Sequence, residues 1–530
     1  MTPETAEIAV VDATSELVPP LERPLGAPHL PAAGVSPSHP AGGPSPAFGA
    51  ASRSRRRAGG FAEPAAARGL RSFDLSAADP AKLLAVREVW GALWSSRLLV
   101  WGAGVATILA LGFGPTRKAF DPPGVTRGFG WLGNLLAAPA ARWDAAWYLV
   151  IARYGYRPDL GVYTSSRTAF FPLYPLGLRA ISWLGAPPVL AGVLLSVVAF
   201  ALALYGIHRL TTLELALGAS STLARDRVAD AARLAVMLTA FAPMAFFFSA
   251  VYSEALYLAL SVGLFWSARQ GRWMWVGVLG ALAGATRSTG LVLVLPALII
   301  YLYGPREDRL PDFLADRPSV RGARLWVWSS AGGLPAILRP RYRLRRDALW
   351  LCLLPAGVVL YGAYLALAGG NPLAPLHAQE VWSRHFAGPY VGIWDGLKAA
   401  FEGARQLLSF QRHHVYFPTG TESPFVSAGH NLMLFAFLAA AIPAIVGVVR
   451  RLPLAYGAYV IAALALPLSY PVSSQPLMSL PRFLLVLFPL GIWLAAWLSE
   501  RPRLQRPVLV LSGALMAFFV AQFATWHWVA

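Results

Sequence analysis

Two acidic side chains and three arginines stand out in this sequence, because each lies at the edge of a long apolar run or in a loop beside one. The acids are Asp144, within a stretch rich in aromatic residues, and Glu254, at the start of an apolar segment. The arginines are Arg287, Arg384 and Arg482. Ionisable groups at a membrane are costly and usually functional, so these residues are the first candidates for an active site.

These residue types suit the transfer of a group from a phosphate to a hydroxyl. A carboxylate can accept the proton of an attacking hydroxyl, so Asp144 is the candidate general base and Glu254 a second catalytic candidate. A guanidinium binds phosphate oxygens in pairs and keeps its charge, which makes the arginines candidates for holding a departing phosphate. The sequence has no glycine-rich loop of the nucleotide-binding type. This absence argues against a nucleotide-sugar donor and favours a lipid phosphate.

The stretch 142–156 predicts the element that positions Asp144. Read as a helix, it places Trp143, Trp147 and Ile151 on one stripe at four-residue spacing. Asp144 and Tyr148 form a second pair beside that stripe. Such a Trp-rich helix is expected to lie flat at the headgroup level and to hold the carboxylate at the membrane surface. The alternative is an interfacial anchor in which the carboxylate is solvated or caps the helix.

The other candidates also have structural alternatives. Glu254 could cap a helix N-terminus, where a carboxylate offsets exposed N–H groups. Arg287 could form a salt bridge with Glu254, and Arg482 could anchor its segment at the interface. The remaining candidate substrate-binding residues are Trp143, Tyr148, Tyr252, Gln379, Trp382 and Arg384.

The composition predicts a helical membrane protein. Of its 530 residues, 56% are hydrophobic and only 13% are charged, whereas soluble proteins carry about a quarter charged residues. The apolar runs are continuous rather than alternating, which favours helices over a barrel. The net charge of +19 is interpreted as the positive-inside bias of short loops and not as a nucleic-acid surface. The single cysteine, Cys352, excludes a disulfide framework. The sequence shows no strong metal-ligand spacing, and it predicts no particular cofactor. A requirement for a divalent metal ion stays an open alternative.

The apolar runs predict about eleven transmembrane helices. Residues 170–184, with Pro172 and Pro175, are short for a crossing and are expected to form a half-span or re-entrant helix. The expected spans are 90–113, 187–208, 233–250, 251–269, 272–287, 288–304, 347–368, 429–449, 453–470, 481–498 and 506–527.

The arginines predict the orientation of these spans. If the N-terminus is cytoplasmic and residues 170–184 do not cross, the arginine-rich loops 209–232, 269–272, 304–346, 450–452 and 499–506 all fall on the cytoplasmic side. The loops 114–168 and 369–428 are then extracytoplasmic, and amphipathic helices are expected in the first of them. Residues 1–87, rich in Pro, Ala, Gly and Ser, are expected to form a disordered cytoplasmic tail before a multi-span domain, 88–530.

Several motifs together resemble a known family. They are the stretch 142–156, Phe170–Pro175, Phe248–Glu254, Thr286–Gly290, Gln379–Arg384 and Ser479–Phe483. In this order, over residues 88–500, they resemble the PIG-V family, which contains the GPI mannosyltransferase 2 type enzymes and their bacterial relatives. The scarcity of cysteine and the abundance of Gly, Pro and Arg fit a bacterial relative better than the eukaryotic enzyme.

The resemblance implies a GT-C fold with its active site at the extracytoplasmic face of a multi-pass plasma-membrane protein. It implies an inverting transfer of mannose from a polyprenyl- or dolichyl-phosphate donor to a glycolipid or cell-surface glycan. Asp144 matches the family's catalytic acidic position, and Tyr252, Glu254 and Arg287 match other motif residues.

Two other classes of protein stay open on the sequence alone. A transporter or flippase for a lipid-linked sugar would explain the spans and charges, but it predicts inverted repeats and charges at mid-membrane. The sequence shows no such repeat, and its charges gather toward one face. A scaffold without chemistry is the third interpretation, and it leaves the ordered motifs unexplained.

Overall fold

The computed structural model describes residues 80–115, 120–156, 166–216, 221–309, 340–413, 415 and 423–529. In these residues the chain forms helices joined by loops, and its β structure is limited to isolated bridges. The α-helices are α2 (Pro80–Leu111), α3 (Gly130–Ala137), α4 (Ala145–Tyr154), α5 (Leu173–Trp183), α6 (Pro188–Ala216), α7 (Thr222–Ala240), α8 (Glu254–Arg269), α9 (Trp273–Thr286), α10 (Val294–Tyr303), α13 (Ala356–Leu367), α14 (Ala374–His377), α15 (Pro389–Ser409), α16 (Pro424–Arg451), α17 (Leu454–Leu468), α18 (Leu480–Leu485), α19 (Phe488–Ser499) and α20 (Pro502–Ala524). The 3₁₀ helices are η3 (Ser166–Ala169), η4 (Ala245–Phe248), η5 (Ser288–Leu293), η7 (Arg346–Leu353) and η8 (Ala378–Trp382).

The expected all-α polytopic membrane protein is confirmed. Four of the described helices, α2, α6, α16 and α20, are each long and apolar enough to cross a bilayer. The pair η7 and α13, bent by 44°, makes a fifth candidate span. Every expected span coincides with a helix or with a pair of successive helices. Several of these helices are shorter than a full crossing, so the number of eleven crossings stays a prediction.

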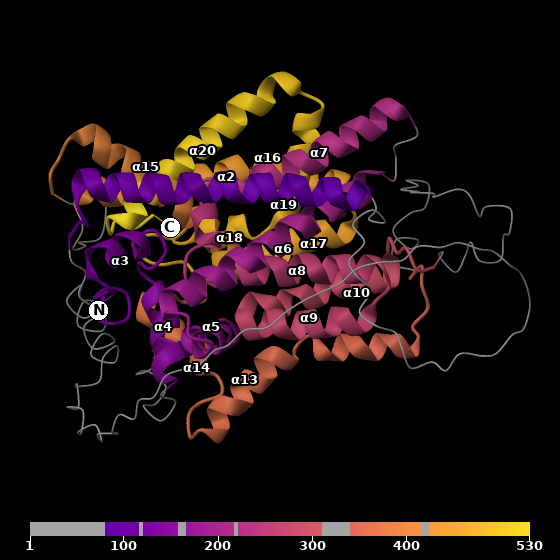
Figure 1. Cartoon of the computed structure of the whole chain (residues 1–530), viewed down its shortest axis with the longest axis horizontal. Helices are drawn as coiled ribbons and strands as arrows, with labels where there is room; N and C mark the ends of the chain where they lie inside the picture. The colour runs from indigo at the N-terminus through magenta and orange to yellow at the C-terminus, as the bar shows by residue number, and fades with distance from the viewer. Residues whose placement is uncertain are drawn as a thin grey trace, which may run out of the picture. The chain divides into compact units, whose positions relative to one another are not determined.

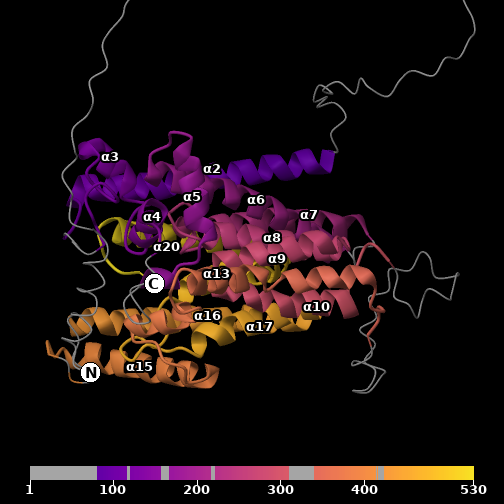
Figure 2. The same ribbon diagram turned by 90° about the horizontal axis from the view of Figure 1, so that it is seen from below.

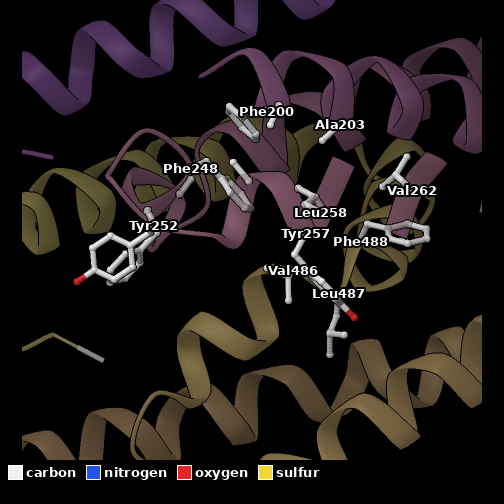
Figure 3. Close-up of a cluster of buried hydrophobic side chains, with 14 of the residues drawn as sticks. Phe200, Ala203, Phe248, Tyr252, Tyr257, Leu258, Val262, Val486, Leu487 and Phe488 are labelled. Carbon is white, nitrogen blue, oxygen red and sulfur yellow. The ribbon is translucent and has the colours of Figure 1, made fainter. Parts of the chain in front are cut away.

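The long helices α2, α6, α8 and α9 run along a common direction, and the short helices α3, α4 and α14 gather toward one end of them (Figures 1 and 2). The core between α6, α8 and the α18–α19 junction is apolar and largely aromatic (Figure 3). Phe200 of α6 stacks on Phe248 of η4, with ring centroids 4.5 Å apart. Small residues permit the close approach of α6 and α8, since a Cβ at Gly206 would meet Val262 at 2.4 Å.

The helix around the Asp144 motif differs from its prediction. It begins at Ala145, one residue after the acid, and residues Ala145–Ala152 are all buried. It therefore packs within the protein, because aromatic side chains from other elements lie against Trp147 and Tyr148. Its flat orientation at the membrane interface stays a prediction. The neighbouring helix α3 does expose an apolar face, at Trp131, Leu132 and Leu136.

Three other predictions can be compared with the fold. Helix α5 has 11 residues, or about 16 Å of rise, which is about half of a bilayer core; its re-entrant character stays a prediction. Helix α2 begins at Pro80, before the expected domain boundary at residue 87. The predicted disordered tail falls, up to residue 79, outside the described residues.

Candidate active site

A cavity of about 590 Å³ lies where α4, η5, α14, η8 and α18 meet. Most of the residues predicted from the sequence line it, although they come from distant parts of the chain. Those that do are Asp144, Tyr148, Arg287, Gln379, Trp382, Arg384 and Arg482. Trp143, Tyr252 and Glu254 lie behind this lining and contact residues that form it.

Arg482 joins the two acids at the wall of the cavity. Its Nη1 donates to Oδ2 of Asp144 at 2.8 Å, and its Nη2 and Nε donate to Oε1 of Glu254 at 2.8 and 3.2 Å. The guanidinium also lies over the rings of Phe247 and Tyr252, with its central carbon 5.0 and 4.9 Å from their centroids. These contacts fix the arginine on several sides. The predicted alternative of a plain interfacial anchor does not describe this environment.

The predicted ion pair between Glu254 and Arg287 is present. Nη1 of Arg287 lies 2.9 Å from Oε1 of Glu254, the same oxygen that accepts from Arg482. The Glu254 side chain is fully buried, whereas that of Arg287 is 16% exposed. Glu254 is the first residue of α8, but its carboxylate serves two arginines. A buried carboxylate between two cations is suited to holding them in place.

Asp144 presents its carboxylate to the cavity. Its side chain is 17% exposed, and it makes no helix-capping hydrogen bond although it occupies the N-cap position of α4. Oδ2 accepts from Arg482, and within the described part of the chain Oδ1 receives no hydrogen bond. This leaves one oxygen available to a hydroxyl group of a bound molecule.

Arg384 supplies a positive charge that is bonded to carbonyl groups. Its guanidinium donates to the carbonyl oxygens of Tyr470 and Met478 at 3.3 and 3.2 Å. Burial and the neighbouring Arg482 lower the pKa of Arg384 to about 10, so it stays protonated at neutral pH. The site thus holds two carboxylates, Asp144 and Glu254, against three guanidinium groups. The excess of one positive charge favours an anionic ligand.

Two tyrosines tie the motifs together. The Tyr148 hydroxyl lies 2.9 Å from Oγ of Ser253, and burial is the main cause that raises the pKa of Tyr148 to about 12. Tyr148 is therefore a neutral hydrogen-bonding group at physiological pH. Tyr252 donates to the carbonyl oxygen of Arg142 at 3.0 Å. Figure 3 shows the Tyr252 hydroxyl pointing away from the apolar cluster.

The backbone before α8 is held by an arginine from the first long helix. Arg97 of α2, only 3% exposed, donates to the carbonyl oxygens of Ala240 and Ala245 and to Oγ of Ser249. Ala240 is the last residue of α7, so Arg97 binds carbonyls at a helix C-terminus, where a positive charge is favourable. The N–H of Val251 in turn donates to the carbonyl oxygen of Ala140 at 2.9 Å, which links this segment to the Asp144 motif.

The backbone of Trp143 has a conformation that is rare for tryptophan. Its φ is +53°, in the left-handed region that costs a non-glycine residue of the order of 1–3 kcal/mol. The ring packs against Phe120, Trp526 and Trp528, with centroid distances of 5.6, 5.7 and 5.2 Å. This turn directs Trp143 into an aromatic cluster and Asp144 into the cavity.

Part of the lining was not predicted from the sequence. Phe170 belongs to the Phe170–Pro175 motif but was not a predicted site residue, and Trp528 lies in none of the motifs. Much of the remaining lining is apolar. Its apolar residues include Leu291, Val292, Val358, Leu373, Leu376 and Leu466.

A metal site is not evident in the part of the chain that the structure describes, which contains no group of three or more His, Cys, Asp or Glu side chains placed to hold an ion.

The helical bundle and its charged cavity are those of an all-α polytopic membrane protein with a site suited to an anionic ligand. Residues 119–301 match the family model described as mannosyltransferase (PIG-V). This part of the chain belongs to the PIG-V family, and the protein is a membrane glycosyltransferase of the mannosyltransferase type. The family implies a lipid-linked sugar donor and a glycolipid acceptor. None of the curated proteins compared with the chain matches it. The bacterial affiliation stays a prediction.

Proposed function

We propose that this enzyme transfers mannose from a polyprenyl- or dolichyl-phosphate mannose to a hydroxyl group of a glycolipid or cell-surface glycan. The excess positive charge of the site suits a phosphodiester, and the apolar residues of the lining suit the isoprenoid chain attached to it. The reaction takes place at the extracytoplasmic face of the plasma membrane.

The observation that carries this proposal is the 2.8 Å contact between Asp144 and Arg482 at the cavity wall. It joins a carboxylate, which can accept a proton, to a guanidinium, which is suited to binding phosphate. An acceptor hydroxyl bonded to Asp144 and a donor phosphate bonded to Arg482 would then be neighbours, as group transfer requires.

In the proposed reaction, Asp144 takes the proton of the acceptor hydroxyl. The hydroxyl oxygen attacks C1 of the mannose on the face opposite the phosphate. The bond between C1 and the phosphate oxygen breaks, and its electron pair leaves with the lipid phosphate, so the configuration at C1 inverts. The proton on Asp144 afterwards passes to water.

The arginines stabilise the charge that develops on the departing phosphate, which becomes a dianion as the bond breaks. Arg287, Arg384 and Arg482 are assigned this role. Glu254 does not line the cavity, and we assign it the positioning of Arg287 and Arg482. Tyr252 and Trp143 likewise act from behind the lining, whereas Tyr148, Gln379 and Trp382 contact the substrates.

The test is a transfer assay with purified protein, a membrane lipid extract and radiolabelled mannose in two forms. One form is polyprenyl-phosphate mannose and the other is a nucleoside-diphosphate mannose. Label is expected to reach an extractable glycolipid or a glycan from the lipid donor alone. Transfer from the nucleotide donor alone, or from neither donor, would overturn the proposal.

A further inference from the structure

The segment that follows α20, Thr525–Val529, reaches the candidate active site. Trp528 of this segment lines the same cavity as Asp144, although the two residues are distant in sequence. The segment also lies outside residues 119–301, which the family model matches. No role has so far been given to it.

The segment is firmly packed. Trp526 is 2% exposed, and its ring lies under the guanidinium of Arg142, with the central carbon 4.6 Å from the ring centroid. Nε of Arg142 also donates to the carbonyl oxygen of Ala524 at 3.2 Å. Val529 is 2% exposed within the main core. Trp528 therefore lies in a segment anchored by the buried Trp526 and Val529, and its ring forms part of the cavity wall.

The segment is close to the proposed base. The ring of Trp528 meets that of Trp143 edge-on, with centroids 5.2 Å apart and planes at 80°. Trp143 directly precedes Asp144, and both Asp144 and Trp528 line the cavity, so a molecule bonded to the Asp144 carboxylate can reach the Trp528 indole within the same space.

A sugar ring has a polar rim of hydroxyl groups and an apolar face of C–H groups. Asp144 can accept from one hydroxyl, and a flat indole beside it can cover the apolar face. We propose that Trp528 is the stacking platform for the acceptor, and that the acceptor therefore presents a sugar ring to Asp144. This inference rests on the proposed function, because it takes Asp144 to be the site of the acceptor hydroxyl.

The experiment measures equilibrium binding of octyl α-D-mannopyranoside, a sugar with a short lipid tail, in the absence of donor. Three variants are compared with the wild type: Trp528→Phe, Trp528→Leu and, as a matched control, Trp131→Leu on α3, where the side chain is 62% exposed. Trp528→Leu is expected to weaken binding about two- to ten-fold, the usual value of an aromatic contact. Trp528→Phe is expected to retain most of the affinity, and the control all of it.

The same measurements separate stacking from simple space-filling. Equal affinity for the Phe and Leu variants would overturn the platform, and so would wild-type affinity in both. The thermal midpoint of each variant is recorded to check that the variant is folded. A further measurement uses the wild-type protein alone. Saturation transferred from the protein to the bound mannoside should concentrate on the C–H protons of one face of the ring, and even saturation of both faces would overturn the inference.

Failure of the proposed function has a different signature. In that case the wild-type protein binds the octyl mannoside through Trp528 but transfers no mannose from the lipid-phosphate donor. If transfer occurs, Trp528→Leu should raise KM for the octyl mannoside as acceptor and leave the affinity for the donor unchanged.

Discussion

Asp144 and Glu254 both pair with Arg482, but their side chains differ in exposure to the cavity. This difference determines the expected effect of a substitution at each acid. The Asp144 carboxylate is partly exposed to the cavity, whereas that of Glu254 is fully buried. A substitution at Asp144 therefore affects the reacting molecules directly. A substitution at Glu254 or Arg482 also disturbs a buried network of charges.

Asp144→Asn should lower turnover by about 10²–10⁴-fold, the usual contribution of a general base. The amide keeps the shape of the side chain and can still accept from Arg482, but it cannot take a proton. Donor affinity should change little, because the phosphate is assigned to the arginines. Turnover and donor binding are measured on the same preparation. The matched control is Asp395→Asn, a carboxylate outside the cavity and 3.6 Å from Lys398. Near-wild-type turnover of the Asp144→Asn protein would make Asp144 a structural residue.

Arg482→Ala should weaken donor binding, because the phosphate loses a charged donor. It should also lower the stability of the fold by several kcal/mol, since the buried Glu254 carboxylate loses one of the two arginines that it pairs with in the described part of the chain. Arg482→Lys separates the two effects. Lysine keeps the charge but lacks the forked geometry, so its donor affinity should lie between those of the wild type and the alanine variant. Donor binding and thermal unfolding are the measurements, and unchanged donor affinity in the alanine variant would contradict the assignment.

The residue types of the site could be predicted from the sequence, but their contacts could not. Asp144, Arg287, Arg384 and Arg482 were recognisable because charge at the edge of an apolar run is rare. The contacts of Arg482 with both acids could not be predicted, because they depend on α18 packing against the start of α8. Trp528 gave no signal at all, since it is one of 19 tryptophans and lies in no motif.

At the scale of the elements, the break between α7 and α8 is what turns Glu254 toward the cavity. Residues 241–253 leave regular helical geometry except for η4. Arg97 of α2 compensates for the break by donating to one of its carbonyl groups, one of its hydroxyl groups and the last carbonyl group of α7. In an apolar environment, an unpaired carbonyl is costly. The break therefore depends on an arginine that is far away in sequence.

Arg97→Leu should reduce both stability and turnover. The substitution strands buried acceptors, each at a cost of about 1–3 kcal/mol, and it frees the segment that carries Glu254. Arg87→Leu is the control, because Arg87 lies on the same helix but is exposed. The thermal midpoint and the transfer rate are measured for both variants. An Arg97→Leu protein with a wild-type midpoint would show that the segment holds its shape without the arginine.

The elements themselves were more predictable than their ends and surroundings. Apolar runs located the helices well, because a membrane helix must satisfy its own backbone. The helix at the Asp144 motif begins later than predicted and is buried within the protein, whereas its position at the interface stays a prediction. Its start depends on the left-handed turn at Trp143, and its burial depends on residues such as Phe170 and Trp382, which stack around Trp147. The hydrophobic periodicity of a single segment predicts neither the start of this helix nor its burial.

At the scale of the whole molecule, the charged clusters lie at opposite ends of α8. Glu254 begins the helix and Arg269 ends it, which separates them by about 22 Å of rise. Arg269 pairs with the buried Glu214 at the end of α6 and lies 3.7 Å from Glu307. That second cluster is remote from the cavity and adjoins the loops predicted to be cytoplasmic.

Deletion of residues 2–79 should leave membrane insertion and mannose transfer intact. The deletion ends just before Pro80, where α2 begins, and it removes none of the residues assigned to the site. A longer deletion, of residues 2–97, is the comparison and should abolish transfer, because it removes Arg97. Insertion is followed by membrane fractionation and transfer by the radiolabel assay. Loss of transfer in the shorter deletion, with normal insertion, would assign the N-terminal residues a direct role.

The predicted orientation can be tested by labelling cysteines in intact cells with a membrane-impermeant maleimide. Cys352, which is exposed, is first replaced by serine. Ser383→Cys, beside the cavity residue Trp382, should react from outside, because the arginine-rich loops place this end away from the cytoplasm. Arg272→Cys, just beyond the other end of α8, should react only after permeabilisation. Because one helix joins the two regions, the pair must label on opposite sides if α8 spans the membrane. Reaction of Arg272→Cys alone in intact cells would invert the topology and move the site to the cytoplasmic face, and reaction of both would show that α8 does not cross.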